Sequence, residues 1–298
     1  MLLLDPDQFQ DCLLEQRTDC WTFLLPPGRF DHILEWLGQH RAMAFGLYAP
    51  LNRLDSDLDG RDQAYHQFLL WDPVARQLIG GQRLRFYAQD GRRHCFRSAT
   101  EATSYLEHCY PGFAQLKLSE YGAFAEVGRT FVMPEYQRSR WLLELIRAFV
   151  RLPEQLGIHR AYGMLSFDQR GLNSQVINLF FTALSCSLFA TEEAVPAPRY
   201  PRDSDVKLEW DLLWDGVNLT ALEILMKAHD QAFVLPPVLR PYRALCSVEF
   251  LGVSMAKSYN QITQLLFSGS SSFITPQQRR RLPDYGLRFD CLDKVLEA

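Results

Sequence analysis

The segment AEVGRTFVMPEYQRSRWLLELIRAFV, residues 125–150, joins an apolar strand to an amphipathic helix through a basic turn. The pattern predicts a strand from about residue 123 to 133 and a helix over about 139–152. Glu126 and Arg129 interrupt the strand, and a regular strand would place them on opposite faces. Gly128 between them favours a β-bulge that brings both side chains to one face. We therefore expect a bulge or a splay within residues 126–133.

Strands and helices alternate on both sides of this segment. The predicted strands cover residues 66–72 and 77–87, joined by a hairpin, and then 160–167, 205–213, 247–255 and 262–268. The predicted helices cover residues 5–16, 30–45, 99–110, 173–184 and 220–232. This order predicts an α/β (α+β) fold with helices on the faces of a mixed, largely antiparallel sheet.

Composition excludes several classes of protein. The 298 residues carry a net charge of -4, with 47% hydrophobic and 22% charged residues, so the chain as a whole is not a nucleic-acid binder. The 7 cysteines are scattered without a CxxC pair, which indicates reduced thiols in a cytoplasm and neither a disulfide framework nor a zinc site. We expect no signal peptide, since the N-terminal apolar run is short, and no membrane span. The sequence contains no G-x-S-x-G, H-E-x-x-H or P-loop motif.

Four further charged residues are candidates for a site. Arg41 lies on the apolar stripe of its helix, so its head either reaches solvent past a buried stem or pairs with a carboxylate. Asp59 and Asp62 form either a solvated acidic turn or part of the same site. Arg83, inside a strand, is expected to face water. His66 is interpreted as a structural or substrate-side histidine and not as a metal ligand.

In sequence order these residues give R-x3-F at Arg41 and Phe45, D-x2-D at Asp59 and Asp62, an arginine in the next strand, and E-x2-R-x-F-V from Glu126. This order resembles the acyl-homoserine-lactone autoinducer synthases and their GNAT-like relatives. The chain is more similar to the N-acyltransferases of ornithine-lipid synthesis and the haemolysin-like N-acyl amino acid synthases. That longer branch also resembles LPPVLRPYRAL, residues 235–245, and the likeness extends over about residues 30–267.

The resemblance implies a twisted GNAT-like sheet and transfer of a fatty acyl group from acyl carrier protein to a small amine. No bound cofactor and no metal are implied; the donor substrate is the phosphopantetheine thioester of the carrier protein. Glu126 and Arg129 are the implied catalytic pair, Glu126 as the base that deprotonates the amine. Arg129 either orients Glu126 or binds the carboxylate of the acceptor. The implied substrate-binding residues are Arg41, Phe45, Asp59, Asp62, Arg83 and Thr130, and we expect the charged members of this set to converge around one pocket with Glu126.

The donor is expected at the turn before the helix over 139–152. Arg138, Ser139 and Arg140 are the candidates for binding the carrier protein or its pantetheine, and Arg147 and Arg151 would extend a basic face for this acidic partner. Trp141, Leu145 and Phe149 form an apolar stripe that is either core or acyl tunnel. The turn QRSRWL lacks the glycines of CoA-binding GNAT acetyltransferases, which weakens a CoA donor without excluding it.

Three readings of function follow. The first is carrier-protein-dependent N-acylation of an amino acid, giving an N-acyl amino acid or an aminolipid precursor, in a cytoplasmic protein with an option of contact at the inner face of the membrane. The second is a CoA-dependent acetyltransferase or a synthase of autoinducer type, and the third a non-catalytic lipid- or partner-binding protein. The predicted domains are an N-terminal helical extension over 1–28, an acyltransferase domain over 29–267 and a tail over 268–298.

Overall fold

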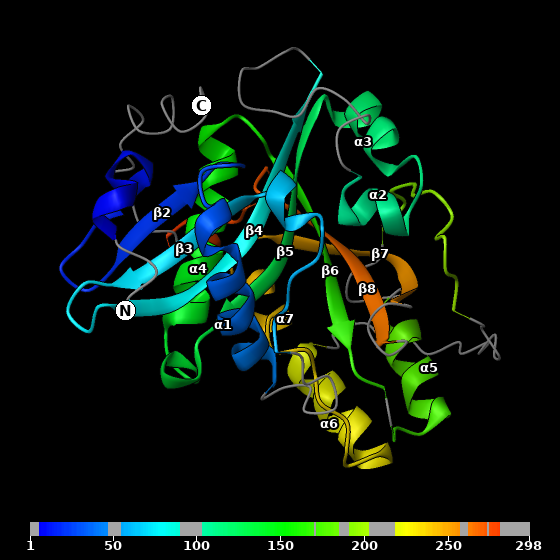
Figure 1. Ribbon diagram of the computed structural model, residues 1–298. Coiled ribbons are helices and arrows are strands. Elements are labelled where there is room, and N and C mark those ends of the chain that lie inside the picture. Colours follow the sequence, from blue (N-terminus) through cyan, green and yellow to red (C-terminus); the bar gives the residue numbers. More distant parts are fainter. Residues whose placement is uncertain are drawn as a thin grey trace.

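The sheet organises the whole chain (Figure 1). A computed structural model describes residues 6–46, 55–89, 103–169, 171–184, 191–202, 218–256, 262–272 and 274–280. Within these residues the sheet has eight strands in the order β1-β2-β3-β4-β5-β6-β8-β7. The strands are β1 (Leu13–Gln16), β2 (Trp21–Leu25), β3 (His66–Asp72), β4 (Gln77–Ala88), β5 (Ala123–Val132), β6 (Arg160–Phe167), β7 (Ser247–Ala256) and β8 (Ile262–Ser270).

The sheet is mixed and largely antiparallel, which confirms the predicted fold class. Only β5 and β6 pair in parallel within the described residues, because the helix that follows β5 carries the chain back across the sheet before β6 begins. The other neighbours, from β1–β2 through to β7–β8, pair in antiparallel fashion. The predicted hairpin between β3 and β4 is present.

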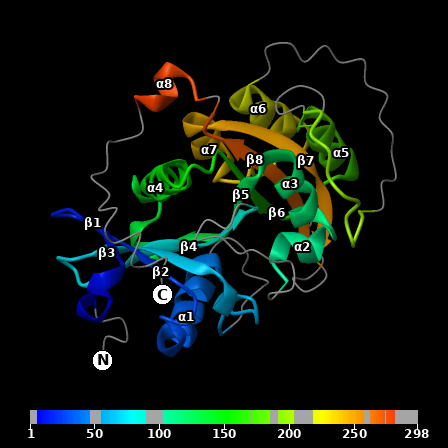
Figure 2. The same ribbon diagram turned by 90° about the horizontal axis from the view of Figure 1, so that it is seen from above.

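Helices cover the sheet on both faces. They are α1 (Leu34–Gly46), α2 (Tyr105–Cys109), α3 (Phe113–Tyr121), α4 (Trp141–Gln155), α5 (Ser174–Ala183), α6 (Leu219–His229), α7 (Leu239–Leu245) and α8 (Pro276–Arg279). Figure 2 shows α1 and α4 on opposite sides of strands β3 and β4. Helix α4 packs on β4 and β5 and against α7, while α3 packs on β4 and β5. The central strands of the sheet are therefore covered by helices on both faces.

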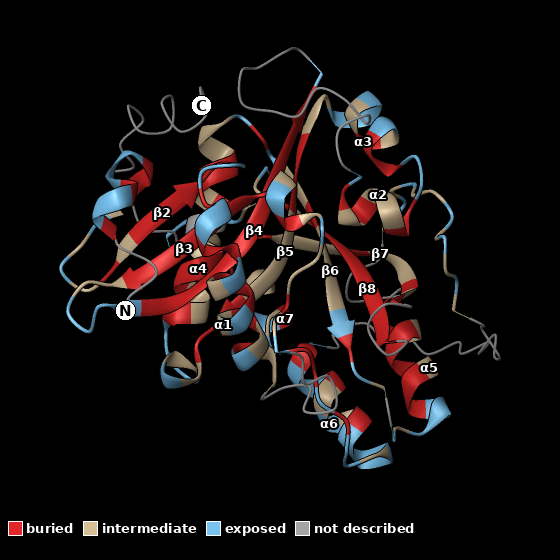
Figure 3. Cartoon of the chain, viewed as in Figure 1, coloured by how far each residue is buried: buried red, intermediate tan, exposed pale blue. Residues whose placement is uncertain are grey.

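The core follows from this layering. One hydrophobic cluster joins the N-terminal strands to α1 and α4, a second joins α5 and α6 to the last strands, and a third lies beneath α2 and α3. In Figure 3 the strands are mostly buried and the helices expose their outer faces. None of the described helices is long and apolar enough to cross a membrane.

The N-terminal prediction is wrong in kind. The helix expected over residues 5–16 is a 3-10 helix, Pro6–Cys12, which gives way to β1, and β2 was not predicted. Residues 13–16 form a strand because Leu13, Glu15 and Gln16 pair with β2, a contact that a local pattern does not reveal. The strand expected over 205–213 lies outside the described residues. The division of the chain at residues 28 and 267 stays a prediction.

Candidate active site

A β-bulge in β5 builds the centre of the site. Gly81 of β4 lies opposite Phe131 and Arg83 lies opposite Gly128, so one residue of β4 stands against two of β5. Arg129, in the bulge, has φ 53°, a left-handed conformation that is uncommon for a residue with a side chain. The predicted bulge within residues 126–133 is confirmed, and it directs Arg129 and Glu126 to the same side of the sheet.

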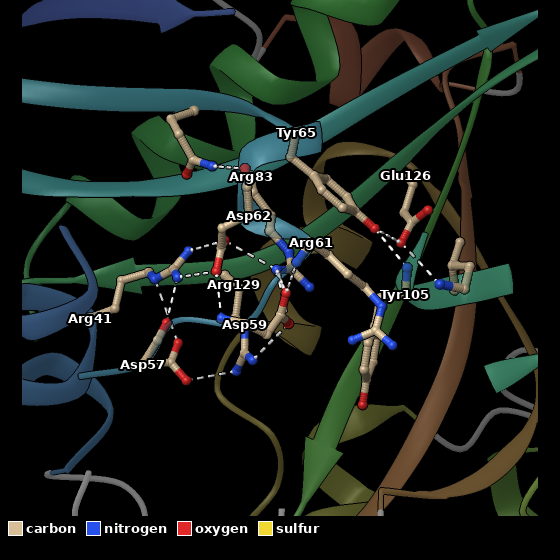
Figure 4. Close-up of polar contacts among 12 residues, drawn as sticks. Arg41, Asp57, Asp59, Arg61, Asp62, Tyr65, Arg83, Tyr105, Glu126 and Arg129 are labelled. Carbon is tan, nitrogen blue, oxygen red and sulfur yellow. Dashed lines mark hydrogen bonds and ion pairs between the residues drawn. The ribbon is translucent and has the colours of Figure 1, made fainter. Parts of the chain in front are cut away.

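Three arginines and three aspartates form one network beside the bulge (Figure 4). Asp62 accepts two hydrogen bonds of 2.8 Å from Arg41 and one of 3.1 Å from Arg83. Arg83 also donates to both oxygens of Asp59 at 3.2 Å. Arg129 pairs with Asp57 at 2.9 Å and with Asp59 at 3.4 Å. Arg41 closes the ring through a hydrogen bond to the backbone carbonyl of Asp57.

Burial and pairing shift the aspartate pKa values in opposite directions. Burial raises the pKa of Asp62, but the hydrogen bonds and charge of Arg41 and the charge of Arg83 outweigh it and hold that pKa well below its usual range. Burial raises the pKa of Asp59 as well, but the positive charges of Arg83 and Arg129 outweigh it and lower that pKa below its usual value. For Asp57, burial outweighs the nearby arginines and raises the pKa. Within the network, the ionised form is therefore favoured most at Asp62 and disfavoured at Asp57.

These contacts correct three expectations from the sequence. Arg83 is 2% exposed and does not face water. Arg41 is 1% exposed and its head pairs with a carboxylate, which decides between the two options left open for it. Asp59 and Asp62 belong to the network and not to a solvated turn. Asp57 was missed, although it continues the alternation of aspartates at 55, 57 and 59.

Glu126 is held by uncharged donors on the same side of the sheet. One carboxylate oxygen accepts the Tyr65 hydroxyl at 2.6 Å and the Leu106 backbone N–H at 3.0 Å, and the other accepts the Tyr87 hydroxyl at 3.2 Å. Burial, followed by the charge of Glu126, raises the pKa of both tyrosines well above the usual value, so both hydroxyls stay protonated and donate. The two tyrosines were not predicted as site residues. They orient Glu126, which is one of the two roles expected for Arg129 from the sequence.

A cavity of about 570 Å³ passes through the sheet at this point. Strands β5 and β6 are last paired at Val127 and Gly163, and beyond this pair they diverge. On the α1 side the cavity is lined by Phe45, Arg83, Glu126 and Arg129. Thr130 of the bulge also lines the cavity, and its hydroxyl donates to the side-chain oxygen of Gln82 at 3.2 Å. Three predicted residues, Arg41, Asp59 and Asp62, do not line the cavity. The two aspartates form ion pairs with the lining residues Arg83 and Arg129, and Arg41 pairs with Asp62.

The apolar part of the cavity is formed by a different face of α4 than expected. Leu142, Val150 and Pro153 line it, together with residues of α7 and β8. Trp141 and Leu145 are buried in the hydrophobic core. The side chain of Phe149 lies outside the described part of the structure. The stripe predicted as either core or tunnel is therefore core at the two positions that are described.

The basic turn before α4 reaches the cavity at two of its three predicted residues. Arg138 and Ser139 line the cavity and are exposed. Arg138 has φ 58°, a left-handed backbone conformation that glycine adopts more readily than other residues. Arg140 points away to an ion pair with Asp19. In the expected basic face Arg147 pairs with Glu144 at 2.9 Å and Arg151 with Glu154 at 3.3 Å. Each glutamate also pairs with a second arginine, Glu144 with Arg17 at 3.4 Å and Glu154 with Arg279 at 2.8 Å. The predicted basic face is therefore a network of ion pairs.

His66, a remaining candidate, has structural surroundings. It is 5% exposed and packs on Phe86 with ring centroids 5.2 Å apart, which favours a structural role. Within the described residues, no group of three or more histidine, cysteine, aspartate or glutamate side chains is disposed to hold a metal ion.

Comparison with known proteins indicates what the chain is similar to. Residues 41–147, less than half of the chain, match the family model described as an acetyltransferase (GNAT) domain, and the mixed sheet is consistent with that fold. A glycine N(alpha)-acyltransferase from Bacteroides thetaiotaomicron is 30% identical over 112 residues, which is 37% of this chain. The match spans about a third, 32%, of the length of that relative.

Two solved structures are similar at a lower level. The CoA-dependent acyl-homoserine lactone synthase BjaI aligns over 91% of this chain and 96% of its own, with 14% identity and a TM-score of 0.44. FeeM, an N-acyl amino acid synthase from uncultured soil microbes, aligns over 60% of this chain and 86% of its own, with 12% identity and a TM-score of 0.30.

Proposed function

We propose that this protein is an N-acyltransferase that moves a fatty acyl group from a thioester to the amine of an amino acid or a related small acceptor. The observation that carries the proposal is the cavity at the divergence of β5 and β6. It is apolar along α4 and α7, as an acyl chain requires, and it contains a buried, oriented carboxylate, Glu126, at its other side. The acyl carbon and the amine would meet at the bulge between these two parts.

Glu126 is the proposed base. An ionised carboxylate has about four lone-pair sites, and Tyr65, Tyr87 and the Leu106 N–H occupy three of them. One site is left to accept a proton from the acceptor amine, directly or through one water. The nitrogen then attacks the thioester carbonyl, the C–N bond forms, the C–S bond breaks, and the departing thiolate takes up a proton. Backbone N–H groups freed at the bulge are suited to the oxygen that becomes negative during attack.

The charged network has a supporting role in this proposal. Arg83 and Arg129 line the cavity, but both are paired with aspartates, so they shape the acceptor end and hold the bulge in place. The pairing also stabilises Arg129 in its left-handed conformation. Thr130 and Phe45 complete the wall around the reacting atoms.

Acyl carrier protein is the proposed donor, with product release as an N-acyl amino acid or aminolipid precursor in the cytoplasm or at the inner face of the membrane. Arg138 and Ser139 at the cavity mouth are the proposed contacts for the pantetheine arm. A CoA thioester is the second candidate, and the match of residues 41–147 to an acetyltransferase (GNAT) domain supports it. Side-by-side turnover of acyl carrier protein and acyl-CoA of the same chain length decides between them.

The proposed base is tested by Glu126→Gln, with glycine as the first acceptor because of the glycine N(alpha)-acyltransferase similarity. We expect kcat to fall about 10²–10⁴-fold with the KM of the donor nearly unchanged, because the substitution removes the proton acceptor and keeps its shape. Glu35→Gln, on the exposed face of α1, is the matched control and should keep wild-type turnover. If Glu126→Gln retains full kcat at an unchanged melting temperature, Glu126 is not the base.

A further inference from the structure

A hydrogen bond between Tyr105 and Gln264 crosses the gap between the diverging strands. Tyr105 is the first residue of α2, and its hydroxyl donates to the side-chain oxygen of Gln264 on β8 at 2.6 Å. Gln264 lies opposite Ser166 of β6, three residues beyond the last β5–β6 pair at Gly163. Both side chains line the cavity. The pair thus forms a wall on the side of the sheet that carries Glu126.

The backbone of Tyr105 ties this wall to the proposed base. The Tyr105 N–H donates to the Tyr65 hydroxyl at 2.7 Å, and that hydroxyl donates to Glu126 at 2.6 Å. The guanidinium carbon of Arg83 lies 6.0 Å from the centre of the Tyr105 ring. Tyr105 therefore connects Glu126 to Gln264 through hydrogen bonds on the cavity wall (Figure 4 shows Tyr105 beside Glu126).

Gln264 is buried and only half satisfied. It is 6% exposed, and among the described residues its side-chain hydrogen bonding is the single bond from Tyr105 to its oxygen. Its side-chain nitrogen is not sealed within the protein, so its N–H groups are accessible to a molecule in the cavity. Its NH₂ group borders the cavity and is suited to an oxygen atom of a bound molecule. Arg129, in contrast, already pairs with two aspartates and is less suited to a new anion.

We propose that Gln264, held by Tyr105, is a specificity-determining residue that hydrogen-bonds an oxygen at the non-reacting end of the acceptor amine, such as a carboxylate. This inference rests on the proposed N-acyl transfer. It places the selection of the acceptor on β8, outside the segment 41–147 that matches the GNAT domain. Members of the same fold that share the charged network would then differ in acceptor through β8.

The test compares Gln264→Leu, which keeps volume and removes the amide, with wild-type enzyme on glycine and on methylamine, which lacks the carboxylate. We expect the KM for glycine to rise about 10-fold or more, the range for losing a hydrogen bond to a charged group, with kcat and the donor KM within about threefold. The preference for glycine over methylamine should shrink by the same factor. Tyr105→Phe keeps the ring and the backbone N–H and should produce a smaller change in the same direction.

Thr263→Val is the matched control. Thr263 precedes Gln264 in β8, its hydroxyl contacts the sulfur of Met255 at 3.5 Å, and its side chain is not part of the cavity wall, so its glycine KM should stay at the wild-type value. Calorimetric titration of glycine into each unloaded variant supplies a second readout that does not depend on turnover, and binding should weaken in Gln264→Leu, less so in Tyr105→Phe, and not in Thr263→Val.

The outcomes separate the two proposals. A glycine KM within twofold of wild type in Gln264→Leu, a uniform loss of kcat on both amines, or a raised donor KM would each overturn the role of Gln264 and leave N-acyl transfer standing. Wild-type enzyme that neither acylates nor binds any amine would overturn the proposed function and this inference together.

Discussion

Arg129 adopts a conformation that the chain would avoid without compensation. A side-chain-bearing residue in the left-handed region is strained by roughly 1–3 kcal/mol, and Arg129 sits there with φ 53°. Its ion pairs with Asp57 and Asp59 oppose this cost, and those aspartates are in turn held by Arg41 and Arg83. The network is therefore the physical support of the bulge, and the bulge opens the cavity.

The support depends most on Asp62, and its pH dependence has a defined sign. Because the folded-state pKa of Asp62 lies below its ordinary value of 3.8, ionised Asp62 stabilises the fold above that value and loses this contribution as the pH falls below it. Asp62→Asn should cost about 3 kcal/mol at pH 7, as for a broken buried pair. Urea unfolding should show this difference constant from pH 8 to pH 5 and shrinking below about pH 4.

Asp57→Asn is the internal comparison for that measurement. Burial raises the folded-state pKa of Asp57, so its ionised form opposes folding above the ordinary value of 3.8 and this cost disappears in acid. The difference in unfolding free energy between wild type and Asp57→Asn should move in the direction opposite to that of Asp62→Asn as the pH is lowered. Parallel pH profiles for the two variants would contradict the assigned shifts.

Charged residues in apolar surroundings made part of the site predictable. Glu126, Arg129 and Arg41 stand out because a buried charge requires a partner, and Gly128 marked the bulge. Tyr65 and Tyr87 gave no such signal, since a tyrosine in a strand is ordinary and its hydrogen bond to Glu126 joins residues 61 and 39 positions apart. Sequence spacing does not encode which hydroxyl meets which carboxylate.

At the scale of elements, a glycine permits the close approach of β5 and β6 at their last pair, Val127 and Gly163. A Cβ on Gly163 would lie 2.9 Å from a side-chain carbon of Val127 and 3.0 Å from its backbone oxygen, so the two strands could not pair as closely there. A Cβ on Gly128 would meet nothing nearer than Nε of Arg83 at 3.5 Å, an ordinary contact. The two glycines of the site therefore have different roles.

This difference predicts the stability of two alanine variants. Gly163→Ala should destabilise the protein by about 1–3 kcal/mol, the usual cost of inserting an atom into a packed region. Gly128→Ala should have a smaller effect because the new methyl group is accommodated. Thermal unfolding of both variants checks the expectation, and an equal melting temperature for the two would show that the β5–β6 contact is not tight.

Helices and strands with a clear periodic pattern in their own sequence were predictable, whereas strands that depend on pairing with distant residues were not. Helix α4 and strands β3, β4, β5, β6 and β8 follow from long periodic patterns, and the structure has them close to the expected bounds. Strands β1 and β2 have 4 and 5 residues and form only by pairing with each other and with β3. Their stability is nonlocal, so residues 13–16 were assigned to a helix that their sequence alone would permit.

The whole molecule has a net charge of -4, and its cationic groups near the cavity mouth are unequal. Arg138 is exposed and lines the cavity, whereas Arg140, its neighbour in the turn, is paired with Asp19. An acidic carrier protein that docks at the mouth would meet the charge of Arg138 directly and the charge of Arg140 already compensated. Long-range attraction between the partners is then concentrated at one residue.

Donor docking should therefore respond to Arg138→Glu more than to Arg140→Glu. We expect the apparent KM for acyl carrier protein to rise about fivefold in Arg138→Glu at low ionic strength, with kcat unchanged, because a reversed charge at the rim slows association and leaves the chemistry intact. Arg140→Glu should have the smaller effect. Both effects should vanish near 1 M salt, where the screening length is about 3 Å. A KM that ignores Arg138→Glu and salt alike, with acyl-CoA used as well as acyl carrier protein, would assign the donor role to CoA.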